Sequence, residues 1–129
     1  MRFELLDVSK GLPEQYDLIT TFDVIHDAVN PLALLRAIRQ GTKDGGSYVM
    51  LEVNCADKHE DNVGPLAAMF YGFSVFYCMT VSLAHGGEGL GTCGMPEAKV
   101  RELCAEAGFG SVSRLPIEDP FNVIYEAKP

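Results

Sequence analysis

Two apolar stretches that each run into a polar turn most constrain what this chain can fold into. Residues 17–24 are nearly apolar throughout, as in a parallel strand that is covered on both faces. Asn30 and Pro31 follow as a helix cap and a first helical residue. The turn at 43–46 then leads into a second apolar strand at 47–53. This alternation predicts an α/β fold with a mainly parallel sheet.

The flanking segments complete the predicted fold. Residues 3–8 read as a short strand, and residues 96–107 read as an amphipathic helix that Gly108 closes. The aromatic-rich segment 65–84 is expected to be helical in part, although 79–83 alternates enough to be a strand. Residues 111–117 and 121–127 predict a terminal antiparallel hairpin.

Composition excludes several classes of function. The chain has 129 residues, a length typical of one domain, and a net charge of −8, which argues against a surface that binds nucleic acid. Its four cysteines contain no C-x-x-C pair and predict reduced thiols in a cytoplasmic protein. Residues 65–84 are long enough to cross a bilayer. Their polar side chains and the lack of basic flanks favour a buried or substrate-covering helix over a membrane span.

Polar side chains stand where three predicted strands end: Asp7, then Asp23, His26 and Asp27, then Glu52. Ligands of open α/β sheets bind beyond the carboxyl ends of the strands. These groups therefore predict a binding pocket with polar side chains at its opening and apolar side chains at its base. His26 is the candidate general base, with a hydrogen-bonded strand-end histidine as the alternative. Asp27 is either a site residue or a helix precap, and Glu52 either a site residue or a solvated strand end.

The order of these motifs closely resembles the class I S-adenosylmethionine-dependent methyltransferases, and in particular a bacterial regulator-like group. The resemblance covers residues 3–127. It rests on five segments: the strand and polar cluster at 16–27, the Asn30-Pro31 helix start, Asp44-Gly45-Gly46, the run 78–84 and the glycine loop at 86–94.

The resemblance implies a Rossmann-like sheet of order 3-2-1-4-5-7-6, whose first two strands this chain lacks. It also implies S-adenosylmethionine as cofactor and a small molecule as acceptor. An aspartate at the position of Asp7 would accept from the adenine amino group. The implied cofactor-binding residues are Asp7, Val8, Phe22 and Asp23, and the implied acceptor-binding residues are His26, Asp27, Glu52 and Tyr77.

The chain also departs from the family pattern. Asp44 replaces the usual proline, and the glycine-rich loop and ribose-binding acid of the family would precede Met1. We therefore expect a partial methyltransferase domain over residues 1–129, with a substrate-covering insert at 61–94. These residues alone should bind the cofactor weakly or not at all and should be inactive. The strand edge left bare predicts a homodimer or strand-exchanged oligomer.

Two other readings stay open. The first is a non-enzymatic, oligomerising remnant of the fold. The second is an NAD(P)-type protein, because residues 89–94 match G-x-G-x-x-G. Against the second reading, Pro96 starts the next helix only after the third glycine, whereas a working fingerprint holds the pyrophosphate on a helix that has already begun.

Overall fold

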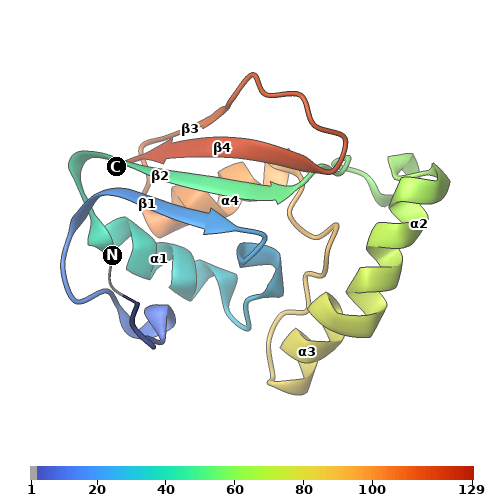
Figure 1. Cartoon of the computed structure of the whole chain (residues 1–129), viewed down its shortest axis with the longest axis horizontal. Coiled ribbons are helices and arrows are strands. Elements are labelled where there is room, and N and C mark those ends of the chain that lie inside the picture. The colour runs from blue at the N-terminus through green and yellow to red at the C-terminus, as the bar shows by residue number, and fades with distance from the viewer. Residues whose placement is uncertain (1–2) are drawn as a thin grey trace.

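A mixed four-stranded sheet organises the chain in the computed structural model, which describes residues 3–129 (Figure 1). Its strands are β1 (Tyr16–Phe22), β2 (Thr42–Val53), β3 (Ser111–Arg114) and β4 (Asn122–Lys128), in the order β1-β2-β4-β3. β1 pairs parallel to β2, and β4 pairs antiparallel to both β2 and β3. The predicted α/β class and the terminal hairpin are confirmed. This strand order matches the last four strands, 4-5-7-6, of the family sheet that the resemblance implies.

Helices α1 (Pro31–Gly41) and α4 (Glu97–Ala107) lie together on one face of the sheet (Figure 1). The Asn30 side chain caps α1 by accepting from the Ala33 amide at 2.9 Å. Gly108 closes α4 with φ of 95°, as the sequence predicted. These helices bury the core against the inner face of β2 and β4. Its most deeply buried side chains include Leu35, Ile38, Tyr48, Met50, Val100, Leu103, Cys104 and Tyr125.

The opposite face of the sheet has no helix over it in the described residues. Leu18 is 58% exposed and Phe22 is 65% exposed, although both lie in the apolar strand β1. The prediction that this strand is covered on both faces is therefore wrong for the part of the chain that the structure describes. The apolar sequence of β1 suits two covered faces, but α1 and α4 supply only one.

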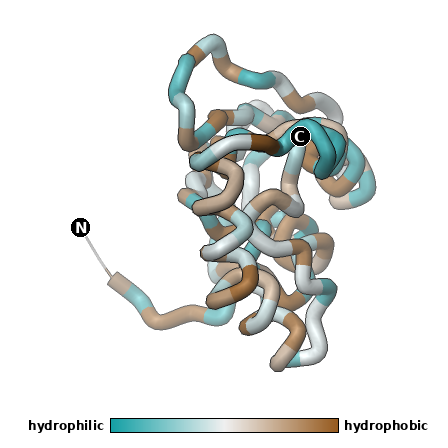
Figure 2. The backbone as a smooth tube through the Cα atoms, turned by 90° about the vertical axis from the view of Figure 1, so that its right-hand side faces the viewer, coloured by the Kyte–Doolittle hydropathy of each residue, from teal (hydrophilic) through white to brown (hydrophobic). Residues whose placement is uncertain are grey.

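The N-terminal segment also differs from its prediction. Residues 3–7 form no strand, and a short 3₁₀ helix (Val8–Lys10) follows them. Figure 2 shows these first described residues running away from the body of the molecule, and Phe3 is 88% exposed. A strand needs a neighbour to pair its backbone groups, and no strand of the described sheet lies beside this segment.

A long helical segment stands across the end of the sheet (Figure 1). It comprises α2 (Gly64–Phe73), a π-helical turn (Ser74–Cys78) and α3 (Met79–Ala84). The helical prediction is confirmed, and the alternative of a strand at 79–83 is wrong. Gly64–Ala84 is the one helix among the described residues that is long and apolar enough to cross a membrane, judged by length and composition only.

The glycine loop packs against this helical segment. A Cβ on Gly91 would overlap the Ser74 hydroxyl, and a Cβ on Gly89 would overlap the Leu83 side chain. The helix after the loop begins at Glu97, and the amide of Ala98 in its first turn already donates to the Asp57 carboxylate at 3.0 Å. Gly89 and Gly91 therefore allow close packing against the helical segment, and one first-turn amide of α4 is already bound to a side chain and not open to a pyrophosphate.

Candidate acceptor site

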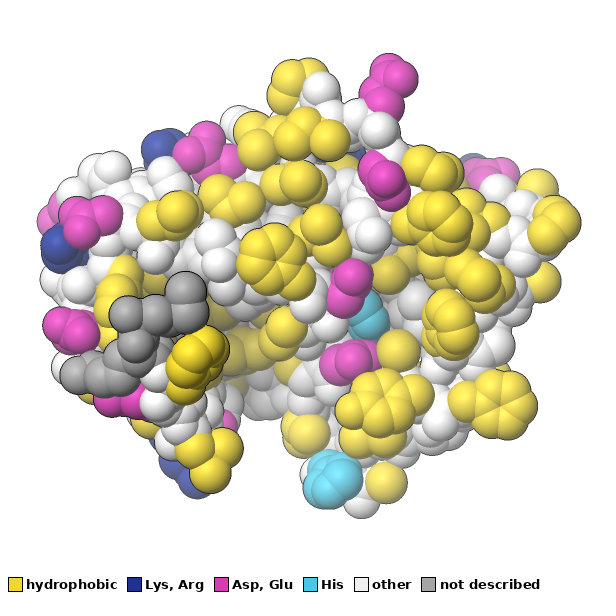
Figure 3. Space-filling view, in the orientation of Figure 1, with side chains coloured by type: hydrophobic (Ala, Val, Ile, Leu, Met, Phe, Trp, Pro, Cys, Tyr) yellow, Lys and Arg dark blue, Asp and Glu magenta, His cyan; other side chains and the backbone are white. Residues whose placement is uncertain are grey.

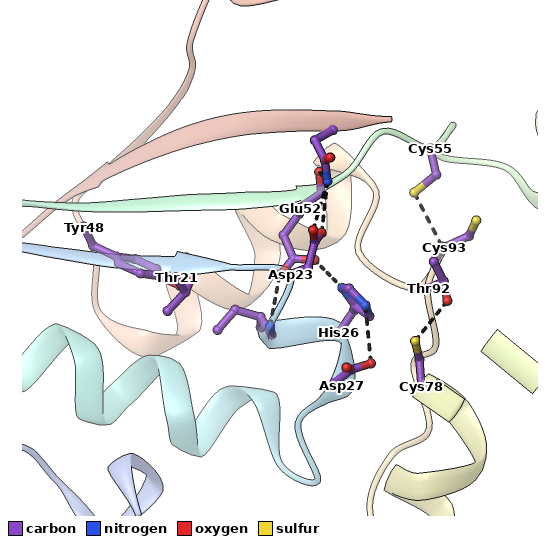
Figure 4. A network of polar contacts seen from close by, with 12 residues as sticks. Thr21, Asp23, His26, Asp27, Tyr48, Glu52, Cys55, Cys78, Thr92 and Cys93 are labelled. Atoms are coloured by element: carbon purple, nitrogen blue, oxygen red, sulfur yellow. Dashed lines mark hydrogen bonds and ion pairs between the residues drawn. The ribbon is translucent and has the colours of Figure 1, made fainter. Parts of the chain in front are cut away.

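The candidate site lies at the carboxyl ends of the parallel strands β1 and β2 (Figure 4). After β1, the chain turns at Asp23, which has φ of 51°, a left-handed conformation that is uncommon outside glycine. The Asp23 amide donates to the Leu51 carbonyl at 2.9 Å. A short 3₁₀ helix (Ile25–Asp27) follows and holds His26 beside the end of β2.

Glu52 anchors this arrangement from β2. Its side chain is fully buried, and His26 is only 3% exposed. One carboxylate oxygen accepts from the Ile25 amide at 3.0 Å, and the other lies 2.6 Å from His26 Nδ1. Both oxygens thus have partners on the segment that carries the histidine. Of the two readings of Glu52, the structure shows a buried strand-end residue that orients His26, and not a solvated one.

Nearby charges set the protonation of His26. Burial by itself lowers the pKa of this imidazole, but the hydrogen bond and the charge of Glu52, with further contributions from Asp27 and Asp23, outweigh it and raise the pKa above its ordinary value. Burial also raises the pKa of Asp23, while His26 and Asn122 partly offset that effect. The site is therefore built to stabilise a proton on the imidazole.

Asp27 faces the other nitrogen of the ring. Its Oδ1 lies 3.3 Å from His26 Nε2, and this oxygen is buried without a hydrogen-bond partner among the described residues. The imidazole is thus placed between two carboxylates, one on each ring nitrogen. Such an arrangement favours a positive charge on or beside Nε2.

A cavity of about 450 Å³ opens onto these groups. Figure 3 shows acidic and histidine side chains together in a hollow that hydrophobic side chains surround. The helical segment supplies most of the apolar wall, and strand-end residues supply the polar part. The lining residues are Asp23, His26, Asp27, Val53, Met69, Phe70, Phe73, Tyr77, Cys78, Thr92, Phe121 and Asn122.

Asp7 and Val8 lie at a second cavity, of about 520 Å³. Residues 28–30 line it as well, so consecutive parts of the segment 26–30 face the two cavities. Asp7 caps the 3₁₀ helix by accepting from the Ser9 amide and hydroxyl at 3.2 and 2.6 Å, and it pairs with Lys10. The Ser9 and Lys10 contacts lower the pKa of the exposed Asp7 carboxyl.

The structure thus groups Asp23, His26, Asp27 and Tyr77 around one cavity, with Glu52 behind His26. Phe22 ends β1 beside this group, with its side chain largely exposed. Sequence reasoning missed several lining residues, notably Cys78, Thr92 and Asn122. The Asn122 amide donates to the Asp23 carboxylate at 3.0 and 3.2 Å across 99 positions of sequence. No local pattern signals that contact, whereas Cys78 already stood in a segment that carried the resemblance.

The strand order and the polar strand ends define the downstream part of a class I methyltransferase fold. No family model and no curated protein matches the sequence, but solved structures, several of them named as methyltransferases, match the fold. TnmH aligns over 98% of this chain with a TM-score of 0.69 and 23% identity. PigF in complex with SAH aligns over 95% with a TM-score of 0.65 and 21% identity. Human N-acetylserotonin methyltransferase in complex with SAM aligns over 98% with a TM-score of 0.64 and 24% identity.

This chain spans about a third of the length of each of these structures, with 35%, 34% and 33% of their chains covered. It therefore has the fold of the C-terminal portion of an S-adenosylmethionine-dependent O-methyltransferase. The partial sheet that the resemblance implies is confirmed for residues 3–129, except that the segment 3–8, expected as one of its strands, forms none.

Proposed function

We propose that this chain forms the acceptor-binding side of an S-adenosylmethionine-dependent O-methyltransferase that acts on a small hydroxylated molecule. The observation that carries the proposal is the His26–Glu52 pair, which is buried at the strand ends and opens into a largely apolar cavity. The matching structures, which include an O-methyltransferase family protein and complexes with SAM and SAH, support it.

In this proposal His26 is the general base. Glu52 accepts from the Nδ1–H, so the neutral imidazole carries its lone pair on Nε2 and can accept the proton of an acceptor hydroxyl there. The imidazolium that forms then lies between the carboxylates of Glu52 and Asp27, so its charge is stabilised where it arises. The aromatic side chains of Phe73 and Tyr77 would hold the apolar body of the acceptor beside this nitrogen.

The cofactor fits the described residues only in part. Asp7 keeps an ionised, exposed carboxylate that suits an adenine amino group, and Val8, Phe22 and Asp23 complete the proposed cofactor-binding set. S-adenosylmethionine, when bound, supplies the methyl group. The oxygens of Asp7 already have partners in Ser9 and Lys10. We therefore propose that these 129 residues alone bind the cofactor weakly or not at all and are inactive alone.

Two titrations test the proposal on the 129-residue chain. Small phenols, followed by NMR, should shift the signals of His26 and Phe73 in wild type, and the shifts should vanish in Phe73→Ala. Ser113→Ala, on the outer strand β3, is the matched control and should bind like wild type. Phenols that perturb neither residue would refute the acceptor site. Calorimetric titration with S-adenosylmethionine should show no micromolar binding. Micromolar binding would refute the proposal that this chain alone binds the cofactor weakly or not at all.

The bare outer face of β1 supports a second proposal, self-association. Leu18 and Phe22 expose apolar surface along a strand whose outer edge is unpaired among the described residues, and such an edge favours pairing with another chain. We propose a homodimer or strand-exchanged oligomer in the cytoplasm.

We also propose that the segment 61–94 covers the acceptor cavity and does not span a membrane, because α2 and the π-helical turn supply the cavity wall.

A further inference from the structure

Three potential metal ligands meet at one wall of the acceptor cavity. His26 Nε2, Asp27 Oδ1 and Cys78 Sγ all lie within 4.8 Å of one another, as Figure 4 shows from the side. The histidine and aspartate come from the segment after β1, and the cysteine comes from the π-helical turn. His26 and Cys78 are 3% and 7% exposed. The fold thus brings a nitrogen, an oxygen and a sulfur donor together from two separate elements.

The polarity of the contact between His26 and Asp27 points to a cation. With the Nδ1–H directed at Glu52, a neutral imidazole presents only a lone pair at Nε2. That lone pair faces Asp27 Oδ1 at 3.3 Å, and this oxygen is also purely an acceptor. Two buried acceptors at this distance repel unless a proton or a metal ion lies between them. Without metal, a proton on Nε2 makes this contact an ion pair, and a metal ion that displaces the proton would bind the same two atoms.

Hydrogen bonds from neighbouring residues hold two of the three donors in orientations that suit metal binding. Glu52 holds the ring nitrogen that faces away from the proposed metal, as a carboxylate does behind many metal-bound histidines. The Thr92 hydroxyl donates to Cys78 Sγ at 3.1 Å, a contact that stabilises negative charge on sulfur. Both partners are buried, so His26 and Cys78 are fixed before any metal binds.

We propose that His26, Asp27 and Cys78 bind one Zn²⁺ ion, with the fourth coordination position directed into the acceptor cavity. Tetrahedral zinc with bonds of about 2.0–2.3 Å keeps its ligand atoms roughly 3.3–3.7 Å apart. The separation of 3.3 Å between Nε2 and Oδ1 matches this spacing, and Sγ lies within 4.8 Å of both atoms. Imidazole and thiolate ligands favour zinc over magnesium or calcium. On binding, Cys78 forms the Zn–S bond and its thiol proton passes to solvent, with no change of oxidation state.

A neighbouring group of donors, Asp23, His26 and Glu52, is a weaker candidate. The carboxylate of Glu52 is already satisfied on both oxygens by the Ile25 amide and by His26. Asp23 accepts two contacts from the Asn122 amide. Metal binding there would break these hydrogen bonds, whereas binding at Cys78 satisfies an oxygen that lacks one.

Titration with Co²⁺, followed by Zn²⁺ displacement, tests the site without cofactor or acceptor. In wild type we expect the near-ultraviolet thiolate-to-cobalt absorption at one equivalent, and its loss when Zn²⁺ is added. Cys78→Ser should abolish the absorption, and Thr92→Val should weaken binding about 10–100-fold, as the loss of a partner behind a ligand does. Cys55→Ser is the matched control and should bind like wild type, because Cys55 lies outside the donor group.

Circular dichroism of each variant verifies that it folds. Absence of the absorption in folded wild type, or an unchanged absorption in folded Cys78→Ser, would overturn the zinc site. Neither result bears on acceptor binding, which the phenol titration measures separately. A metal ion on Nε2 would occupy the nitrogen of the proposed base, so zinc should inhibit methyl transfer in any longer protein that contains this chain and binds the cofactor. That consequence alone rests on the proposed function.

Discussion

Replacing Glu52 with glutamine is the sharpest test of how the site is built. The carboxylate accepts from two donors, the Ile25 amide at 3.0 Å and His26 Nδ1 at 2.6 Å. A glutamine amide offers one acceptor oxygen and one NH₂ donor. If the oxygen keeps the Ile25 bond, the NH₂ group faces Nδ1, and the imidazole must move its proton to Nε2. Glu52→Gln should therefore invert the tautomer of His26 and remove the free base.

The expected energetic cost follows from the bond that is lost. A hydrogen bond to a charged group contributes about 1.5–3 kcal/mol, so unfolding free energy should fall by roughly that amount below pH 6.5. His26 has a raised pKa in the folded state. Its contribution is thus fully present below the unfolded pKa of about 6.5 and is lost as the pH rises through the folded value. The deficit of Glu52→Gln should accordingly shrink at alkaline pH.

Denaturant unfolding at two pH values measures the deficit, and the ¹⁵N chemical shifts of the His26 ring report its tautomer, both with a metal chelator present. Glu126→Gln is the matched control: this residue on β4 accepts from Ser47 and pairs with Lys128 at the surface, so its cost should stay within about 1 kcal/mol. An unchanged tautomer together with a deficit that does not depend on pH would refute the orienting role of Glu52.

Three further predictions concern the fold. Asn30→Ala removes the cap of α1 and should cost about 0.5–2 kcal/mol in denaturant unfolding; an unchanged midpoint would contradict the capping role. Gly91→Ala should destabilise the chain more than Gly86→Ala in the same assay, because both glycines have φ of 76° but only at Gly91 does a Cβ meet a neighbour; equal losses would show that packing against Ser74 is unimportant. Sedimentation velocity should show a concentration-dependent oligomer that Leu18→Lys dissociates, and a wild-type monomer at all concentrations would exclude self-association.

The elements that the sequence predicted well are those with local signals. The Asn30-Pro31 start of α1 and the Gly108 end of α4 each depend on backbone preferences that a few neighbouring residues decide. The turn predicted at 43–46 is wrong in part, because these residues lie within β2, where its pairing with β1 is irregular. The polar strand ends were also predictable, because parallel pairing of β1 and β2 brings their carboxyl ends to one edge. The grouping of His26 with Glu52 follows from that pairing alone.

The predictions that were wrong concern partners outside the local sequence. Residues 3–8 have the composition of a strand, but strand formation depends on a neighbour that the described sheet does not place beside them. The apolar pattern of β1 indicates two faces suited to burial, but its side chains are at most partly buried. The contact of Asn122 with Asp23 joins opposite ends of the chain, so no spacing rule could have predicted it.

The site divides its two tasks between parts of the chain that can be tested separately. The groups proposed for the acceptor come from the end of β1, from β2, from α2 and from the π-helical turn, and internal hydrogen bonds of the described residues fix the most buried of them. The groups proposed for the cofactor, by contrast, lie in an exposed segment and on an uncovered strand end. Acceptor binding should therefore persist in this chain when cofactor binding is absent. Loss of phenol binding in Phe73→Ala, while the fold is retained, would place the acceptor within the cavity that these elements form.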